Sequence, residues 1–114
     1  MEKDNLIVRL TLDFAVEIVN YAETLEANRK YVIARQLLKS GTSIGANVRE
    51  AQNAESPNDF VHKMKIAAKE VEETDYWLLI CSRVETYPNC TDLKAQLLNI
   101  QRIINKIIIT CKTK

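Results

Sequence analysis

Hydrophobic and polar residues alternate along this chain with the period of α-helices, about 3.6 residues. The first apolar stripe predicts a helix over about residues 10–27, with acidic residues on its opposite side. Its members are Leu10, Phe14, Ile18, Tyr21 and Leu25. The short apolar run at residues 6–8 fits either an extended lead-in or an early turn of this helix, and the pattern alone does not separate the two.

A second helix is expected over about residues 29–55, with Asn28 as its N-cap. Its apolar stripe is Leu37, Gly41, Ile44, Val48 and Ala51. Beside that stripe, about 100° around the helix, lies a polar seam with the same spacing, formed by Gln36, Ser40, Ser43, Asn47 and Glu50. Gly41 and Gly45 each cost about 1 kcal/mol relative to alanine inside a helix, so we interpret them as close-packing positions for another backbone.

Two further helices are predicted over about residues 57–84 and 91–111. The first of them has a strong start signal, because Ser56 can cap, Pro57 suits the first helical position and Asp59 favours the positive end of the helix dipole. Asn89 or Thr91 is expected to cap the last helix. Four amphipathic helices with short connectors predict one all-α domain over residues 1–114, an antiparallel up-and-down four-helix bundle.

Apolar surface on the first and last helices exceeds what one bundle core requires, which indicates a partner of the same kind. The first helix adds Leu6, Ile7, Val8 and Leu12 to its stripe, and the last adds Ile103, Ile104, Ile107, Ile108 and Ile109. We therefore expect a homo-oligomer.

Composition places the chain away from membranes and secretion. Charged residues at positions 2–4 stand where a signal peptide needs a hydrophobic core, and no apolar run is long enough to span a bilayer, so a cytoplasmic protein is expected. Cys81, Cys90 and Cys111 are odd in number and lack C-x-x-C spacing, which favours reduced packing residues over disulfides or zinc.

Candidate chemistry is sparse. A di-iron bundle needs a Glu-x-x-His motif on each of two helices, whereas His62 is the one histidine of the chain, so neither metal nor cofactor is predicted. Without a nucleophile and base on one face, an enzyme is not expected. The polar seam, facing Glu70 and Glu73 of the third helix, is either a buried network that aligns helices or subunits, or a solvated flank.

Nucleic acid is a weaker candidate partner, because sixteen basic and fifteen acidic residues leave a net charge of only +1. Local basic spacing occurs on the third and fourth helices, where lysines or arginines recur at intervals of two to four residues. The candidate contacts are Lys63, Lys65, Lys69, Arg102 and Lys106.

The segments S-I-G-A-N-V-R-E-A-Q-N-A (43–54) and D-F-V-H-K-M-K-I-A-A-K-E-V-E-E-T-D-Y-W-L (59–78) resemble the family related to proteins encoded in intervening sequences of 23S rRNA genes, the S23-type proteins. The resemblance implies a four-helix bundle that assembles as a homopentameric ring, with a largely unassigned function and no catalytic residues. The positions that correspond are Gln36, Ser43, Asn47, Glu50, Phe60, Ala67, Glu73 and Leu78.

More distantly, the chain is similar to the accessory variability determinant of diversity-generating retroelements, a basic pentamer that binds nucleic acid and a reverse transcriptase. Two functions are thus expected in order. The first is a non-enzymatic oligomeric scaffold or adaptor. The alternative is an accessory RNA- or DNA-binding protein that acts with a nucleic-acid enzyme such as a reverse transcriptase.

Overall fold

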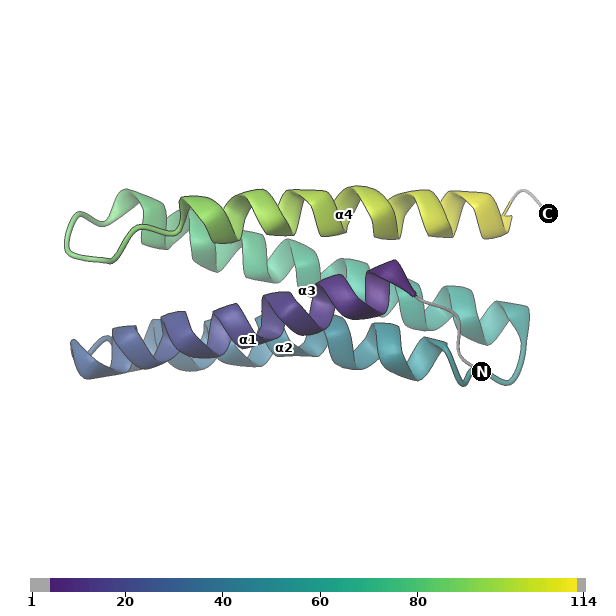
Figure 1. Ribbon diagram of the computed structural model, residues 1–114, viewed down its shortest axis with the longest axis horizontal. Helices are drawn as coiled ribbons and strands as arrows, with labels where there is room; N and C mark the ends of the chain where they lie inside the picture. The colour runs from purple at the N-terminus through teal and green to yellow at the C-terminus, as the bar shows by residue number, and fades with distance from the viewer. Residues whose placement is uncertain (1–4, 113–114) are drawn as a thin grey trace.

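Four helices make up the protein in a computed structural model that describes residues 5–112 (Figure 1). They are α1 (Leu6–Ala27), α2 (Tyr31–Ala51), α3 (Pro57–Arg83) and α4 (Thr91–Lys112). No strand occurs within the described residues. The predicted all-α, antiparallel four-helix fold is confirmed.

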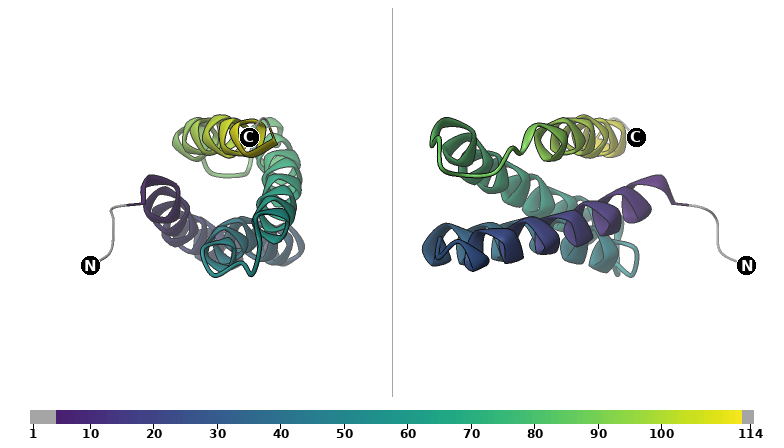
Figure 2. Two further views of the ribbon diagram at one scale, coloured as in Figure 1. Left: turned by 90° about the vertical axis from the view of Figure 1, so that its right-hand side faces the viewer. Right: turned by 60° about the vertical axis from the view of Figure 1, so that its left-hand side comes forward.

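Each helix packs beside the next along the chain, and α4 returns to the side of α1 (Figure 2). The start of α1 and the end of α4 therefore lie at the same end of the molecule (Figure 1). The α1–α4 pair packs less extensively than the other three neighbouring pairs. As a result, α1 and α4 keep more of their surface outside the bundle than α2 and α3 do.

The core consists of the inward stripes that the helical period predicts. Phe14, Ile18, Leu37, Ile44 and Leu78 have no exposed surface at all. Buried side chains of the fourth helix complete the core, namely Leu93, Leu97, Ile100 and Ile104. Burial of a large aliphatic or aromatic side chain contributes about 1.5–3 kcal/mol, so these stripes supply the main stabilisation of the fold.

Helix α1 begins at residue 6, four residues before the predicted start at residue 10. Asn5 caps it, because its side-chain oxygen accepts a hydrogen bond from the Val8 amide at 3.4 Å. The Asn5 amide group also donates to Gln52 Oε1 at 2.9 Å, which ties the start of α1 to the end of α2. Ile7, 4% exposed, joins the core. Residues 6–8 are therefore the first helical turn.

The turn between α1 and α2 differs from the prediction that Asn28 caps the second helix and that this helix begins at residue 29. Asn28 is the C-cap of α1, and Arg29 adopts a left-handed backbone with φ of 64°. The Arg29 amide donates to the Glu26 carbonyl at 2.9 Å and the Lys30 amide donates to the Leu25 carbonyl at 2.8 Å. This pair of bonds is a Schellman motif, so helix α2 starts only at residue 31.

Helix α2 ends at Ala51, four residues before the predicted end at residue 55. The amides of Gln52, Asn53 and Ala54 bond to carbonyls three residues earlier, which tightens the chain beyond the α-helix. Ser56 is then extended and caps α3, accepting from the Asp59 amide at 3.0 Å as predicted. Helices α3 and α4 match their predicted ranges within one residue at each end.

Gly41 and Gly45 face α1, in agreement with their interpretation as close-packing positions. A Cβ atom at Gly41 would lie 2.9 Å from both Cγ1 and Cγ2 of Ile18. At Gly45 it would lie 3.2 Å from the Thr11 carbonyl oxygen and 3.3 Å from Thr11 Cβ. The missing side chains let α1 approach α2, and the contact is tightest at Gly41.

We predict that the effect of Gly41→Ala on stability changes sign with the residue at position 18. In the native background, overpacking against Ile18 costs about 1–3 kcal/mol, more than the gain in helix propensity of about 1 kcal/mol. In an Ile18→Ala background the clashing atoms are gone, so Gly41→Ala should stabilise by about 1 kcal/mol. Urea unfolding of the four proteins of this cycle measures both effects.

Gly45→Ala is the matched control, since its contacts are looser and its cost should be smaller. Equal effects of Gly41→Ala in both backgrounds would contradict the close-packing role.

Candidate assembly surface and polar seam

The polar seam of α2 lies mostly in solvent. Gln36 and Glu50 are exposed, whereas Ser43 and Asn47 are half-buried and bond to their own helix. The Ser43 hydroxyl donates to the Lys39 carbonyl at 2.7 Å, and the Asn47 amide group donates to the Ser43 carbonyl at 2.8 Å. The seam is thus a solvated flank over most of its length, and its buried part is confined to Ser40.

Ser40 and Thr74 form a buried hydroxyl pair between α2 and α3. Both side chains have 0% exposure, and their hydroxyl oxygens lie 2.9 Å apart in a hydrogen bond. Thr74 Oγ1 is also bonded to the Glu70 carbonyl at 2.7 Å. Thr74 was absent from the sequence-based candidates because its position falls on the apolar stripe of α3. A hydroxyl on an apolar stripe, opposite a serine on the next helix, is the signal that could have found it.

The two glutamates expected to face the seam interact mainly within α3. Glu73 accepts a hydrogen bond from Trp77 Nε1 at 3.4 Å, four residues along the same helix. Partial burial, together with the charge of Glu73, raises the pKa of the Glu70 carboxyl, and Lys39 of α2 opposes that shift. Their side chains therefore contribute no hydrogen bond to Ser40, Ser43 or Asn47.

Glu50 connects the seam to one of the basic candidates. Its Oε1 atom lies 3.0 Å from Lys63 Nζ, and the bond raises the pKa of the Lys63 ammonium. The pair joins the end of α2 to the start of α3. Because Glu50 already compensates the positive charge of Lys63, this lysine is less suited to phosphate binding than its spacing indicates.

The remaining basic candidates lie on two helices. Lys65 of α3 comes close to Lys112 at the end of α4, and contact with that second ammonium lowers the pKa of Lys65. Lys69 follows one turn later on α3, whereas Arg102 and Lys106 are exposed on α4. Lys112, unlike the others, had no spacing signal in the sequence, since its proximity to Lys65 arises from the antiparallel packing of α3 and α4.

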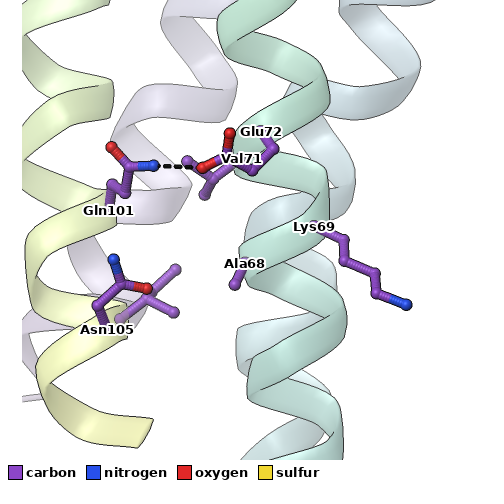
Figure 3. A pocket seen from close by; sticks show the side chains of 7 residues that line it. Ala68, Lys69, Val71, Glu72, Gln101 and Asn105 are labelled. Atoms are coloured by element: carbon purple, nitrogen blue, oxygen red, sulfur yellow. Dashed lines mark hydrogen bonds between the residues drawn. The ribbon is translucent and has the colours of Figure 1, made fainter. Parts of the chain in front are cut away.

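A shallow pocket of about 160 Å³ lies between α3 and α4 (Figure 3). Ala68 and Val71 line it, and a hydrogen bond of 2.6 Å from Gln101 Nε2 to Glu72 Oε2 crosses its edge. Lys69 extends away from the pocket (Figure 3). Sites for small ligands usually enclose about 300–1,000 Å³, so this pocket is too small for a typical ligand.

Tyr21, Cys81 and Cys90 meet beneath the α3–α4 loop. The Tyr21 hydroxyl donates to the Pro88 carbonyl at 2.7 Å, and Cys90 Sγ lies 3.5 Å from the Leu78 carbonyl oxygen. Burial, followed by the nearby thiols, raises the pKa of Tyr21, and burial also raises the pKa of both cysteines. The two thiols are buried and protonated, and they pack as predicted, whereas Cys111 is half-buried.

The same loop region contains two larger hollows, of about 480 Å³ beside Tyr21 and about 390 Å³ beside Cys81. Their side chains include acids, amides and thiols. Among residues 5–112, however, no group of three or more His, Cys, Asp or Glu side chains gathers as a metal site would require.

Exposed apolar side chains gather on the outward sides of α1 and α4. On α1 they are Leu12, Val16 and Val19, with exposures of 52%, 53% and 37%. On α4 they are Leu98 and Ile109, with exposures of 46% and 63%. Of the surplus apolar residues named from sequence, Leu6, Leu12 and Ile109 are exposed, whereas the others are buried or packed against the core. Val16, Val19 and Leu98 are additions from the structure.

These outward positions define two surfaces. The α1 outer face consists of Leu12, Val16, Val19, Glu23 and Glu26. The α4 outer face consists of Leu98, Arg102, Lys106 and Ile109. Both sets follow spacings of three and four residues, so each lies along one side of its helix.

A groove of about 200 Å³ continues the α1 outer face toward α2. Val8, Leu12 and Ala15 line it from α1, and Thr42 and Ala46 from α2, with Gly45 between the helices. Apolar atoms thus reach the surface across both helices rather than along α1 alone.

Comparison with known proteins agrees with this architecture. The family described as 23S rRNA-intervening sequence protein matches residues 3–106. A crystal structure at 1.70 Å of a protein with unknown function, from the S23 ribosomal protein family of Bacteroides thetaiotaomicron VPI-5482, is 40% identical. The match covers 90% of this chain and 97% of the other, with a TM-score of 0.85. No curated protein matches the chain.

Fold and surface define an antiparallel four-helix bundle with a solvated polar flank and exposed apolar faces. In the described part of the chain, no helix combines the length and apolar character needed to cross a bilayer. Given the match over most of its length, the chain belongs to the 23S rRNA-intervening sequence protein family.

For the buried hydroxyl pair, Thr74→Val is expected to destabilise the fold by about 1–3 kcal/mol, because the Ser40 hydroxyl loses its partner in a dry environment. Ser40→Ala should cost less, since Thr74 retains its bond to the Glu70 carbonyl. The double variant should be more stable than Thr74→Val alone. Urea unfolding checks the order, with Ser43→Ala as the solvated control.

A Ser40→Ala cost equal to or above that of Thr74→Val would contradict the asymmetry derived from the Glu70 bond.

Proposed function

We propose that the protein is a non-enzymatic, cytoplasmic scaffold or adaptor that works as a homo-oligomer. Exposed apolar residues on α1 and α4 are the observation that carries the proposal. Contiguous exposed apolar surface typically marks an interaction site. Five subunits is the number that the family resemblance implies.

The state of the reactive groups supports a role without catalysis. Burial raises the pKa of Cys81 and Cys90, so both are poor nucleophiles near neutral pH. Glu50, one of the acids considered for chemistry, is exposed and ion-paired with Lys63. Unpaired thiols also agree with a reducing compartment such as the cytoplasm.

Light scattering coupled to size-exclusion chromatography tests the assembly. At micromolar concentration we expect a single species of five times the 13.1 kDa chain mass. Thermal stability should also rise with protein concentration, because association stabilises the folded state by mass action. A monomer of unchanged mass over this range would refute the proposal.

Nucleic-acid binding in support of an enzyme such as a reverse transcriptase is the second candidate function. The approach of Lys65 to Lys112 favours it, because two ammonium groups held together by the fold attract a phosphate more strongly than isolated ones. Lys69 extends this positive surface along α3. Repetition of a weak patch around an oligomer would increase affinity through multivalency.

Filter binding of single-stranded RNA and DNA at low salt tests this candidate. Lys65→Glu combined with Lys69→Glu should reduce retention at least about tenfold, since it replaces two phosphate contacts by repulsion. Arg35→Glu combined with Lys94→Glu makes the same change in charge elsewhere and should leave most of the retention. No retention of nucleic acid by the native protein would remove this function.

A further inference from the structure

We propose that neighbouring copies of this chain bind head to tail, with the α1 outer face of one subunit against the α4 outer face of the next. The inference rests on the proposed function and deepens it, because it names the two surfaces through which the oligomer forms. The occupant of each face is thus a second copy of the chain.

Apolar residues occupy both faces at matching spacing. Val16 and Ile109 are among the most exposed large hydrophobic side chains of their helices, at 53% and 63%. On each helix the residues of the face recur every three or four positions, which forms a ridge that can pack into the groove of another helix. Docking would remove these side chains from water.

Charge makes the two faces complementary rather than merely sticky. Helix α1 carries four carboxylates and one arginine, a formal charge of −3, whereas α4 carries four basic residues and one aspartate, a formal charge of +3. On the faces themselves, Glu23 and Glu26 stand against Arg102 and Lys106, all exposed. The near-neutral total of +1 conceals this separation.

This complementarity selects a second copy as the occupant. An acidic apolar face and a basic apolar face on one chain fit each other, while each repels a copy of itself. A symmetric contact of α1 with α1 would place two pairs of glutamates together, and α4 with α4 would do the same with basic groups. The favourable contact is therefore between unlike faces.

The two faces lie on different helices, at different positions around the bundle axis (Figure 2). A subunit that uses both must contact two neighbours, one through each face. Contacts between unlike faces produce either a closed ring or an open filament, depending on the rotation between subunits. The geometry thus accounts for a ring without any additional surface.

Apolar substitutions test the location of the contact. Val16→Lys and Ile109→Glu each place a charge opposite a group of the same sign, so each should weaken association at least about tenfold. Val32→Glu is the matched control, because Val32 is 65% exposed on α2 and outside both faces. Light scattering gives the assembly state, and circular dichroism verifies that each variant remains folded.

Charge reversal tests the pairing of unlike faces. The variant Glu23→Lys/Glu26→Lys and the variant Arg102→Glu/Lys106→Glu should each dissociate the oligomer, and the combined fourfold variant should restore it. Controls with the same changes in charge are Glu55→Lys/Asp75→Lys and Arg35→Glu/Arg83→Glu, which lie outside the faces. They should leave the native assembly intact.

The outcomes separate this inference from the proposed function. A monomeric native protein refutes the proposed function itself. A native oligomer that survives Val16→Lys, Ile109→Glu and both reversals overturns the inference alone. Dissociation by each folded reversal without recovery in the fourfold variant also overturns it, because unlike faces in direct contact require that recovery.

Discussion

Close contact between α1 and α2 at Gly41 is the constraint on which much of the molecule depends. The missing side chain admits Ile18, a fully buried residue, to the position that a Cβ atom would occupy. Thr11, beside Gly45, bonds its hydroxyl to the Ile7 carbonyl of its own helix, so the approach leaves no buried polar group without a partner. With its inner side committed to α2 and the core, α1 presents Leu12, Val16 and Val19 outward.

Local satisfaction of polar groups explains why the interior offers little chemistry. Ser43 and Asn47 bond to carbonyls of α2, and Thr74 bonds to a carbonyl of α3 as well as to Ser40. A buried polar group that already has its partners gains little from a ligand. What remains available is the outside of the bundle, where apolar side chains and charges of opposite sign occur on different helices. The physical properties of the chain therefore favour association over catalysis.

Periodicity predicted the fold because burial of one side of a helix requires a repeat of 3.6 residues, which is visible in any single helix. Ser56 and Pro57 likewise act within one turn, so the start of α3 was predictable. The α1–α2 boundary was not, because Asn28 suits either a helix start or a helix end, and the left-handed Arg29 backbone decides between them. Thr74 escaped prediction for a related reason, since its partner lies 34 residues away.

By itself, the sequence determined four amphipathic helices, their inward stripes, the close-packing glycines and an excess of apolar surface, because each depends on residues within a few turns of one another. Tertiary structure decided which polar groups are buried, how Lys63 is neutralised by Glu50, and that Lys65 meets Lys112. It also decided which apolar residues of α1 and α4 remain exposed. Those outcomes depend on how helices are rotated and paired in space, and contacts between distant segments leave no local pattern in the chain.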